Sequence, residues 1–146
     1  MARLPRRLRI AEPCVGMGGV AEMFRICEMQ YDGTNCYDID PRLQKFHIGV
    51  AEAHGQAVRQ GGFGAAGDIR SVDVKDLADS DVLACGPPCS PWAGTGARQG
   101  RLDPRSEVYF TVVEWVIYLA KRGSLLAFAI ENSVATTHHL RGQCPS

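Results

Sequence analysis

The sequence predicts an α/β domain built on an open parallel β-sheet. Short apolar runs alternate along the chain with segments whose apolar residues recur at helical spacing, which is typical of βαβ units. A glycine-rich turn directly follows the first run, and the last run is apolar throughout, as strands of parallel sheets often are. The 146 residues suffice for one domain with its own core, and the sequence contains neither internal repeats nor an interior linker.

The first half of the chain contains two expected strands and two expected helices. Gly33 is expected to end the first helix, and Pro41 to open the second, because proline favours the first helical turn. The expected elements are a strand over Leu8 to Cys14 that leads into Gly16-Met17-Gly18-Gly19, a helix beyond these glycines from Val20 to about Gln30, a strand over Thr34 to Ile39, and a helix from Pro41 to about His54.

The second half begins with a glycine-rich segment, Gln60 to Gly67, which predicts a loop ending at Gly67-Asp68-Ile69. Asp103 followed by Pro104 is typical of a helix start, and Gly123 of a helix end. The expected elements are a buried strand over Asp81 to Cys85, a helix carrying Val108, Val112, Trp115, Val116 and Leu119, and a last strand over Leu125 to Ile130, buried on both faces.

Cys89 lies in a stiff turn, Gly86-Pro87-Pro88-Cys89-Ser90-Pro91-Trp92, just past the expected strand that ends at Cys85. Open α/β sheets hold their ligands at this edge, and the two prolines before the cysteine fix the backbone that carries the thiol. An isolated cysteine is more often a small buried apolar residue. The rigid turn at the strand end nevertheless favours a functional thiol, which acts as a nucleophile in its thiolate form.

The glycine loop fits the pattern Gly-x-Gly-x-x-Ala at Gly16, Gly18 and Ala21, and the acidic Asp38 follows about 20 residues later. This arrangement favours a nucleotide-type cofactor whose ribose hydroxyls would bind the acidic side chain. The loop itself leaves open a dinucleotide or S-adenosylmethionine. Glu12, close before the loop, would repel a pyrophosphate and suits a cationic ligand, which favours S-adenosylmethionine.

Glu131 follows the last expected strand in Phe128-Ala129-Ile130-Glu131-Asn132-Ser133. Buried carboxylates are costly unless they are paired or used in chemistry. If the two strands are neighbours, Glu131 lies beside Cys89. Two roles then fit the carboxyl group: it caps loop backbone, or it holds or protonates a ring nitrogen while the thiolate attacks the ring.

The order of these motifs resembles the cytosine-5 DNA methyltransferase family from about Leu8 to Val134. Cys14-Val15-Gly16-Met17-Gly18-Gly19 is similar to the family's Phe-Ala-Gly-x-Gly-Gly cofactor loop, with Cys14 in place of the phenylalanine. The resemblance implies the Rossmann-like fold of S-adenosylmethionine-dependent methyltransferases, truncated after about five strands in the order 3-2-1-4-5. The residues implied to bind the cofactor are Cys14, Gly16, Gly18, Gly19, Asp38, Ile39, Asp68, Ile69 and Pro87, and those implied in catalysis are Cys89, Glu131 and Arg105.

The resemblance also implies a reaction, the transfer of a methyl group from S-adenosylmethionine to carbon 5 of cytosine in DNA. Cys89 would add to carbon 6 of the ring and Glu131 would hold its N3. Asp38 would bind the cofactor ribose, and Asp68 the adenine amino group. The target base must leave the duplex stack for this chemistry.

Residues 1–146 resemble the N-terminal, cofactor-binding and catalytic part of such a domain, and no target-recognition region is recognisable after Glu131. We therefore expect this polypeptide alone to bind DNA weakly and to turn over slowly or not at all, with a second polypeptide as one source of the missing region. Three alternatives stay open: a non-catalytic or half-enzyme cofactor-binding subunit, an RNA cytosine-5 methyltransferase, and an NAD-binding Rossmann module.

The composition limits the partners and the cellular compartment that we expect for this chain. The 16 basic and 16 acidic residues create no global field, although arginines gather in two places. The sequence lacks a secretory apolar core and any run near the ~18 apolar residues of a membrane span. The six cysteines form no C-x-x-C pair, so we expect no metal, reduced thiols and an intracellular protein, nuclear if eukaryotic. The arginine sets are Arg3, Arg6, Arg7 and Arg9, and Arg98, Arg101 and Arg105; a His138-His139 pair is expected to be a polar tail.

Overall fold

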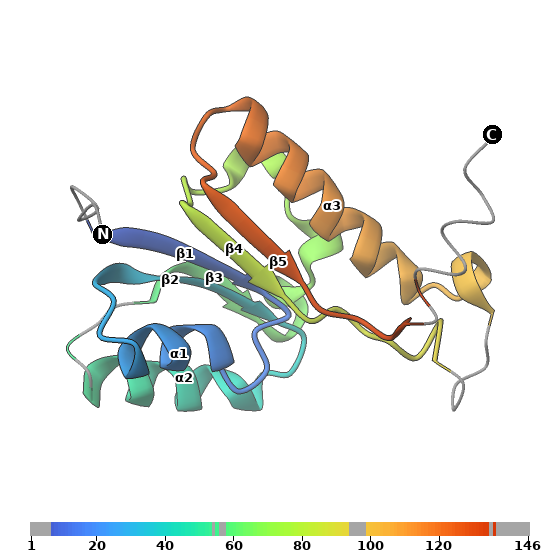
Figure 1. Ribbon diagram of the computed structural model, residues 1–146. Coiled ribbons are helices and arrows are strands. Elements are labelled where there is room, and N and C mark those ends of the chain that lie inside the picture. The colour runs from blue at the N-terminus through green and yellow to red at the C-terminus, as the bar shows by residue number, and fades with distance from the viewer. Residues whose placement is uncertain (1–6, 54, 56–57, 94–98, 135, 137–146) are drawn as a thin grey trace.

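The computed structural model describes residues 7–53, 55, 58–93, 99–134 and 136, and within these residues five parallel strands form one sheet (Figure 1). The strand order β3-β2-β1-β4-β5 confirms the order expected from the sequence. The strands are β1 (Leu8–Pro13), β2 (Tyr31–Asp38), β3 (Val58–Phe63), β4 (Val82–Cys85) and β5 (Ala127–Ile130), and the α-helices are α1 (Gly19–Ile26), α2 (Arg42–Ala53) and α3 (Ser106–Lys121).

Helices cover both faces of the sheet, with α1 and α2 on one side and α3 on the other (Figure 1). Side chains alternate along a strand, so neighbouring residues of β1 enter different cores. Ile10 packs with Phe24 of α1, whereas Ala11 belongs to the larger cluster that includes Leu83 of β4 and Trp115 of α3. This three-layer arrangement leaves the carboxyl edge of the sheet to the loops that follow β1, β2, β3 and β4.

The third strand, Val58–Phe63, extends into the first part of the segment Gln60 to Gly67, for which the sequence predicts a loop. β3 pairs with β2 from Thr34↔Val58 to Asp38↔Phe63. A Cβ atom on Gly61 would overlap the carbonyl group of Cys36. The expectation of a loop was wrong because this glycine permits close backbone packing within a sheet and does not mark a turn.

Gly33 also has a role different from the expected one. It does not end the first helix, since α1 stops at Ile26 and Glu28 follows with a positive φ of 54°. Instead Gly33 lies inside β2 with φ 86°, where the pairing steps from Leu8↔Tyr31 to Ile10↔Thr34. The extra residue on β2 is a β-bulge, and its left-handed backbone suits glycine.

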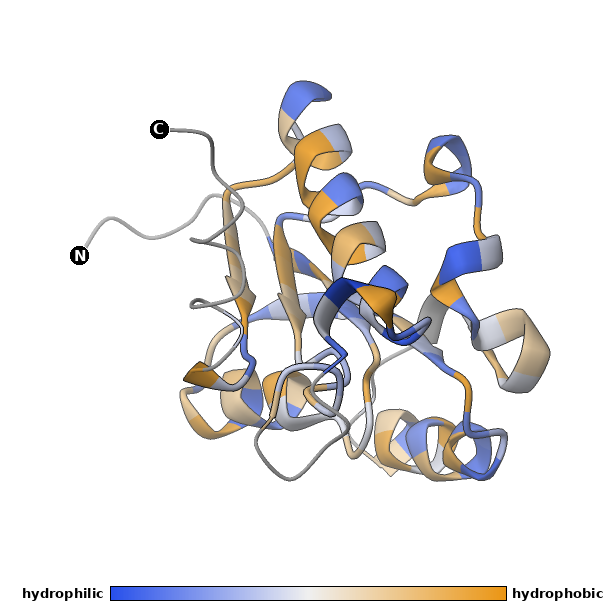
Figure 2. Ribbon diagram, turned by 90° about the vertical axis from the view of Figure 1, so that its right-hand side faces the viewer, coloured by the Kyte–Doolittle hydropathy of each residue, from blue (hydrophilic) through white to orange (hydrophobic). Residues whose placement is uncertain are grey.

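Two further expectations concern the end of the chain. β5 is not buried on both faces: it is the edge strand of the sheet, and its ribbon has the colour of hydrophobic residues in Figure 2. Phe128 of this strand is 58% exposed. Helix α3 begins at Ser106, later than the expected Asp103-Pro104 start. The Asp103 carboxylate accepts a hydrogen bond from the Arg105 amide at 2.9 Å, which closes a turn before the helix.

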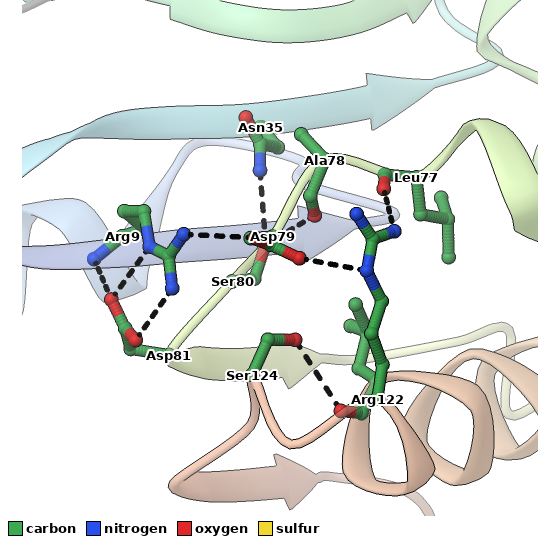
Figure 3. Close-up of polar contacts among 10 residues, drawn as sticks. Arg9, Asn35, Leu77, Ala78, Asp79, Ser80, Asp81, Arg122 and Ser124 are labelled. Carbon is green, nitrogen blue, oxygen red and sulfur yellow. Dashed lines mark hydrogen bonds and ion pairs between the residues drawn. The ribbon is translucent and has the colours of Figure 1, made fainter.

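An ionic network fixes the amino edge of the sheet (Figure 3). The Arg9 guanidinium donates to both carboxylate oxygens of Asp81, each at 3.0 Å, and the Asp81 side chain is fully buried. Asp79 lies 3.4 Å from Arg9 Nη1 and 3.1 Å from Nε of Arg122, which follows α3. The network therefore joins β1, the segment before β4 and the end of α3.

Several expectations concern residues outside those described: Arg3, Arg6, Arg98, His138 and His139, together with the His54 end of the second helix. No helix among the described residues has both the length and the apolar character needed to cross a membrane. Within the same residues, no cluster of three or more histidine, cysteine or carboxylate side chains is arranged to hold a metal ion.

Candidate cofactor and catalytic site

Two adjoining cavities lie at the carboxyl edge of the sheet and share Cys14 and Gly86 in their walls. The first cavity has a volume of about 290 Å³, and the second of about 340 Å³. Cavities of this size are in the range that holds small ligands. The first cavity is lined by Cys14, Gly16, Asp38, Ile39, Gly67, Asp68, Ile69, Gly86, Pro88 and Val108, and the second by Glu12, Cys14, Val15, Gly19, Val20, Ala84, Cys85, Gly86, Ala129 and Glu131.

The glycine loop is held from two sides. The Gly16 amide donates to Asp38 Oδ2 at 2.9 Å, and the Nε2 atom of His47 lies 2.7 Å from the Gly16 carbonyl oxygen. Gly16 and Gly18 have φ values of 50° and 76°, which favour glycine. A Cβ atom on Gly18 would lie 2.7 Å from the imidazole of His47, so the buried ring packs directly beneath the loop.

The carboxylate of Asp38 organises the start of the first cavity. It accepts the Gly16 amide on Oδ2 and the Asp40 amide on Oδ1, at 2.9 and 3.0 Å. A carboxylate oxygen has capacity for a second hydrogen bond, so both oxygens can still accept from hydroxyl groups. Ile39 follows in the cavity wall and supplies an exposed apolar side chain.

Asp68 reaches the same cavity through a tight turn after β3. Gly67 makes the turn possible, because a Cβ atom there would overlap the carbonyl group of Asp38. Arg70 donates hydrogen bonds from Nε and Nη2 to the Asp68 carboxylate, at 2.9 and 2.7 Å. These hydrogen bonds lower the pKa of that carboxyl group. Asp68 is therefore ionised and oriented, with the buried Ile69 beside it.

Glu12 is the buried carboxyl group of the second cavity, with only 3% of its surface exposed. Its Oε1 accepts the Val20 amide at 3.1 Å, whereas Oε2 is buried and has no hydrogen-bond partner in the part of the chain that the structure describes. Burial raises the pKa of Glu12 to about 7, against the opposing hydrogen bonds from the amides of Val20 and Ala21. A cationic ligand group in the cavity would satisfy the free oxygen.

The Cys89 loop continues directly from β4. The carbonyl oxygen of Cys89 accepts hydrogen bonds from the amides of Trp92 and Ala93, each at 2.9 Å. The side chain of Trp92 is 1% exposed and anchors this turn in the protein, whereas Cys89 itself is exposed. Pro87 is buried in the loop, and its carbonyl oxygen accepts from Asn132 Nδ2 at 3.3 Å. The thiol is thus presented to solvent by a rigid support.

Glu131 approaches the base of the Cys89 loop because β4 and β5 are parallel neighbours. Its amide donates to the Cys85 carbonyl oxygen at 2.9 Å, and its Oε2 lies 3.4 Å from where a Cβ atom on Gly86 would stand. Arg105 lies apart at the start of α3, where Nη2 is 2.6 Å from Asp103 Oδ2. The Arg105 hydrogen bonds lower the pKa of Asp103.

The structure thus gathers most, but not all, of the residues selected from the sequence. Among the described residues, those around the two cavities are Cys14, Gly16, Gly19, Asp38, Ile39, Asp68, Ile69 and Glu131; those outside the cavity walls are Gly18, Pro87, Cys89 and Arg105. His47 was missed by the sequence analysis. A histidine within an otherwise ordinary helix carries no motif, and only the folded loop reveals its contact with Gly16.

Comparison with known proteins gives consistent matches. The chain is 30% identical over 135 residues to "Type II methyltransferase M.NlaX" of Neisseria lactamica, which covers 92% of this chain and 39% of that protein. It is 31% identical over 130 residues to "Type II methyltransferase M.NgoBI" of Neisseria gonorrhoeae, covering 88% of this chain and 35% of that protein. The chain therefore spans less than half the length of these relatives.

A solved structure shares the fold. The S. pombe Dnmt2 methyltransferase superposes with a TM-score of 0.62 at 20% identity, covering 94% of this chain and 39% of that one. The sequence model of the family described as "C-5 cytosine-specific DNA methylase" matches residues 57–144, a range that includes Cys89 and Glu131. The chain belongs to the C-5 cytosine-specific DNA methylase family.

Proposed function

We propose that this chain is the cofactor-binding and catalytic part of an enzyme that methylates carbon 5 of cytosine in DNA, with S-adenosylmethionine as the methyl donor. One observation carries the proposal: loops after β1, β2, β3 and β4 converge on two joined cavities next to the Cys89 loop. Membership in the family supports the same reaction. The NAD-binding alternative explains neither the Cys89 loop nor Glu131.

The chemistry of the cavity walls fits S-adenosylmethionine. Asp38 has acceptor capacity for the ribose hydroxyls, and the ionised Asp68 can accept from the adenine amino group. Ile39 and Ile69 supply apolar surface for the adenine ring in the first cavity. Glu12 offers a carboxyl oxygen to the cationic end of the ligand in the second. When bound, S-adenosylmethionine supplies an electrophilic methyl group.

The protein side chains supply the activation of cytosine. The thiolate of Cys89 adds to carbon 6 of the ring, which makes carbon 5 electron-rich enough to be methylated. Glu131 holds or protonates N3 and so stabilises the adduct. Loss of the proton from carbon 5 and release of the thiol then restore the aromatic ring. Arg105, fixed by Asp103, is the third residue that we assign to the catalytic side.

DNA is the proposed substrate, with the target cytosine rotated out of the duplex to reach the exposed thiol of Cys89. Target recognition is assigned to sequence outside this part of the domain, because the chain spans only 39% and 35% of the two bacterial relatives. Either a longer polypeptide or a second chain would supply that region. The exposed edge strand β5 is where we expect such a region to pack.

The test is covalent trapping on a DNA duplex that carries 5-fluorocytosine. Fluorine at carbon 5 cannot leave as a proton does, so a competent thiolate stays attached to the base. We expect a protein–DNA adduct in the mass spectrum that requires S-adenosylmethionine and disappears in Cys89→Ser. The Cys27→Ser variant is the matched control, since Cys27 is also exposed but lies at the end of α1.

Calorimetric binding of S-adenosylmethionine should accompany the trapping experiment. Asp68→Ala should weaken binding while leaving the fold intact, because it removes the acceptor from the cavity wall. Cofactor binding without a trapped adduct would show that these residues do not carry the catalytic step by themselves. Absence of both binding and adduct would reject the proposed function of the cavities.

A further inference from the structure

Two thiols meet at the wall that the two cavities share. Cys14 follows β1 and Cys85 ends β4; both line the second cavity, and Cys14 packs against the core cluster to which Cys85 belongs. Cys85 is buried, whereas Cys14 is half-buried and lines both cavities. Neither thiol takes part in the proposed activation of cytosine.

The strand pairing gives these thiols a spacing suited to a disulfide. β1 and β4 are parallel neighbours with Ile10 opposite Val82 and Ala11 opposite Leu83, and this register places Cys85 beside the end of β1. Neighbouring strands lie about 4.8 Å apart. Extended by two residues, the register sets Cys85 opposite Pro13, the residue before Cys14. A disulfide needs Cα atoms roughly 4.4–6.8 Å apart, which neighbouring strand ends offset by one residue allow.

The surroundings distinguish this pair from the other described cysteines. Cys36 is buried, donates to Thr34 Oγ1 at 3.0 Å, and has its pKa raised by burial to about 11. Interaction with the Cys14 side chain and burial keep the Cys85 thiol protonated by raising its pKa. Cys14 lines both cavities and Cys85 lines the second, so an oxidant that enters the first cavity meets Cys14, and one that enters the second meets both thiols.

We propose that Cys14 and Cys85 are a redox-active pair that a peroxide converts into a disulfide, which reshapes the shared wall and weakens binding of S-adenosylmethionine. The second half of this inference rests on the proposed function. The Cys14 sulfur attacks hydrogen peroxide and breaks its O–O bond. One oxygen stays on the sulfur as a sulfenic acid, and the other leaves as hydroxide, which takes the Cys14 thiol proton and becomes the first water. The Cys85 sulfur then attacks the Cys14 sulfur, the S–O bond breaks, and the Cys85 proton leaves with the hydroxide as a second water. Two thiols are oxidised and one peroxide is reduced.

Formation of the disulfide should change the shape of both cavities, because the two sulfur atoms in their walls move toward each other. A disulfide requires an S–S distance of about 2.05 Å and a fixed dihedral angle, much closer than two thiols in contact. Cys14 already has a left-handed backbone, with φ 58°, so the loop has little freedom to absorb the shift. Gly16 and Gly18 follow within four residues, and the change reaches the glycine loop directly.

The experiment is peptide mapping after exposure to hydrogen peroxide. No lysine or arginine lies between Lys75 and Arg98, so trypsin leaves Cys85 and Cys89 on one peptide. The chain is therefore studied as Cys89→Ser. After blocking of free thiols and digestion without reductant, we expect peptide 10–25 to be linked to peptide 76–98, and the link to disappear with dithiothreitol. In the Cys89→Ser chain, a second substitution, Cys14→Ser or Cys85→Ala, should abolish the link. A second substitution Cys27→Ser should leave the link unchanged.

Calorimetry on the same samples tests the consequence for the cavities. We expect the dissociation constant for S-adenosylmethionine to rise at least about tenfold on oxidation and to recover with dithiothreitol, whereas peroxide should not change it in Cys14→Ser. Circular dichroism confirms that each variant is folded. Oxidation of Cys14 to a sulfinic acid without the link would overturn the redox pair, and a link without a change in affinity would overturn its effect on the cavities. If the reduced chain fails to bind S-adenosylmethionine, the proposed function fails, and the linked peptide still decides the redox pair.

Discussion

The imidazole of His47 supports the glycine loop from below, with Nε2 2.7 Å from the carbonyl oxygen of Gly16. A carbonyl oxygen only accepts, so Nε2 carries the proton and donates. The ring also stacks on Phe63 of β3 at a centroid distance of 5.7 Å. Helix α2 and strand β3 thereby set the position of a loop that neither of them belongs to.

Removal of this support should loosen the loop. We expect His47→Ala to weaken binding of S-adenosylmethionine by roughly threefold to tenfold, since one hydrogen bond contributes about 0.5–1.5 kcal/mol. His47→Gln should recover part of the affinity, because its amide can donate to the same carbonyl. Lys45→Ala, at an exposed position of the same helix, is the control for calorimetric titration. Equal affinities in His47→Ala and Lys45→Ala would contradict a positioning role.

Glu12 should make stability depend on pH. Its pKa is about 7 in the folded chain and 4.5 ordinarily, so the unfolded chain ionises first as the pH rises. The free energy of unfolding should therefore fall between pH 4.5 and 7, by about 3 kcal/mol in all, and change no further above pH 7. Glu12→Gln cannot ionise and should lack this contribution, which makes it more stable than the parent at pH 8.

Urea denaturation across this pH range measures the Glu12 contribution as the difference between the parent and the variant. Glu52→Gln, a change at an exposed carboxylate of α2, controls for the lost charge. A constant difference between parent and Glu12→Gln from pH 4 to 8 would exclude the shifted carboxyl group.

The Arg9–Asp81 ion pair at the amino edge of the sheet should contribute more to the free energy of unfolding than an ion pair on the surface. Arg9→Met leaves the fully buried Asp81 carboxylate without its guanidinium, and we expect a loss of about 3 kcal/mol in the free energy of unfolding (Figure 3). Arg25→Met breaks an exposed pair with Glu22 and should cost about 0.5 kcal/mol or less. The midpoints of urea denaturation, compared at equal m-values, measure the two losses in the free energy of unfolding. Similar losses for Arg9→Met and Arg25→Met would refute the prediction that the buried ion pair contributes more.

The apolar edge strand should limit the solubility of this chain. Phe128 and Leu126 are 58% and 62% exposed at β5, and exposed apolar edges promote association. Phe128→Lys should raise the concentration at which sedimentation still detects monomer, with little change in the free energy of unfolding. Phe46→Lys on α2, a less exposed phenylalanine, serves as the comparison. If Phe128→Lys stays monomeric to no higher concentration than Phe46→Lys, β5 is not the surface through which the chain associates.

The sequence predicts the central sheet well because its signals there are strong. Apolar runs mark β1 and β4, and glycines mark the loop between β1 and α1. The same runs place Cys89 and Glu131 at the ends of adjacent strands. Parallel pairing then brings their loops to one edge without further information.

The remaining features depend on contacts that no local pattern encodes. β3 escaped detection because Gly61 and Gly62 are selected by close backbone packing and leave no apolar run. The exposure of β5 follows from its place at the edge of the sheet. The pairing of Cys14 with Cys85 depends on two strands far apart in the chain, as does the contact of His47 with Gly16.

The central place of β1 has a consequence for the order in which the chain folds. β1 pairs with β2 soon after it in sequence and with the much later β4, and the Arg9–Asp81 bond closes a loop of 72 positions. Local pairing is entropically cheaper than closing a long loop. During synthesis, β1, α1 and β2 can therefore assemble while the other side of β1 waits for its neighbour. The Cys89 loop, which follows β4, joins the domain late, so an incompletely made chain displays the glycine loop before it presents the exposed thiol of Cys89.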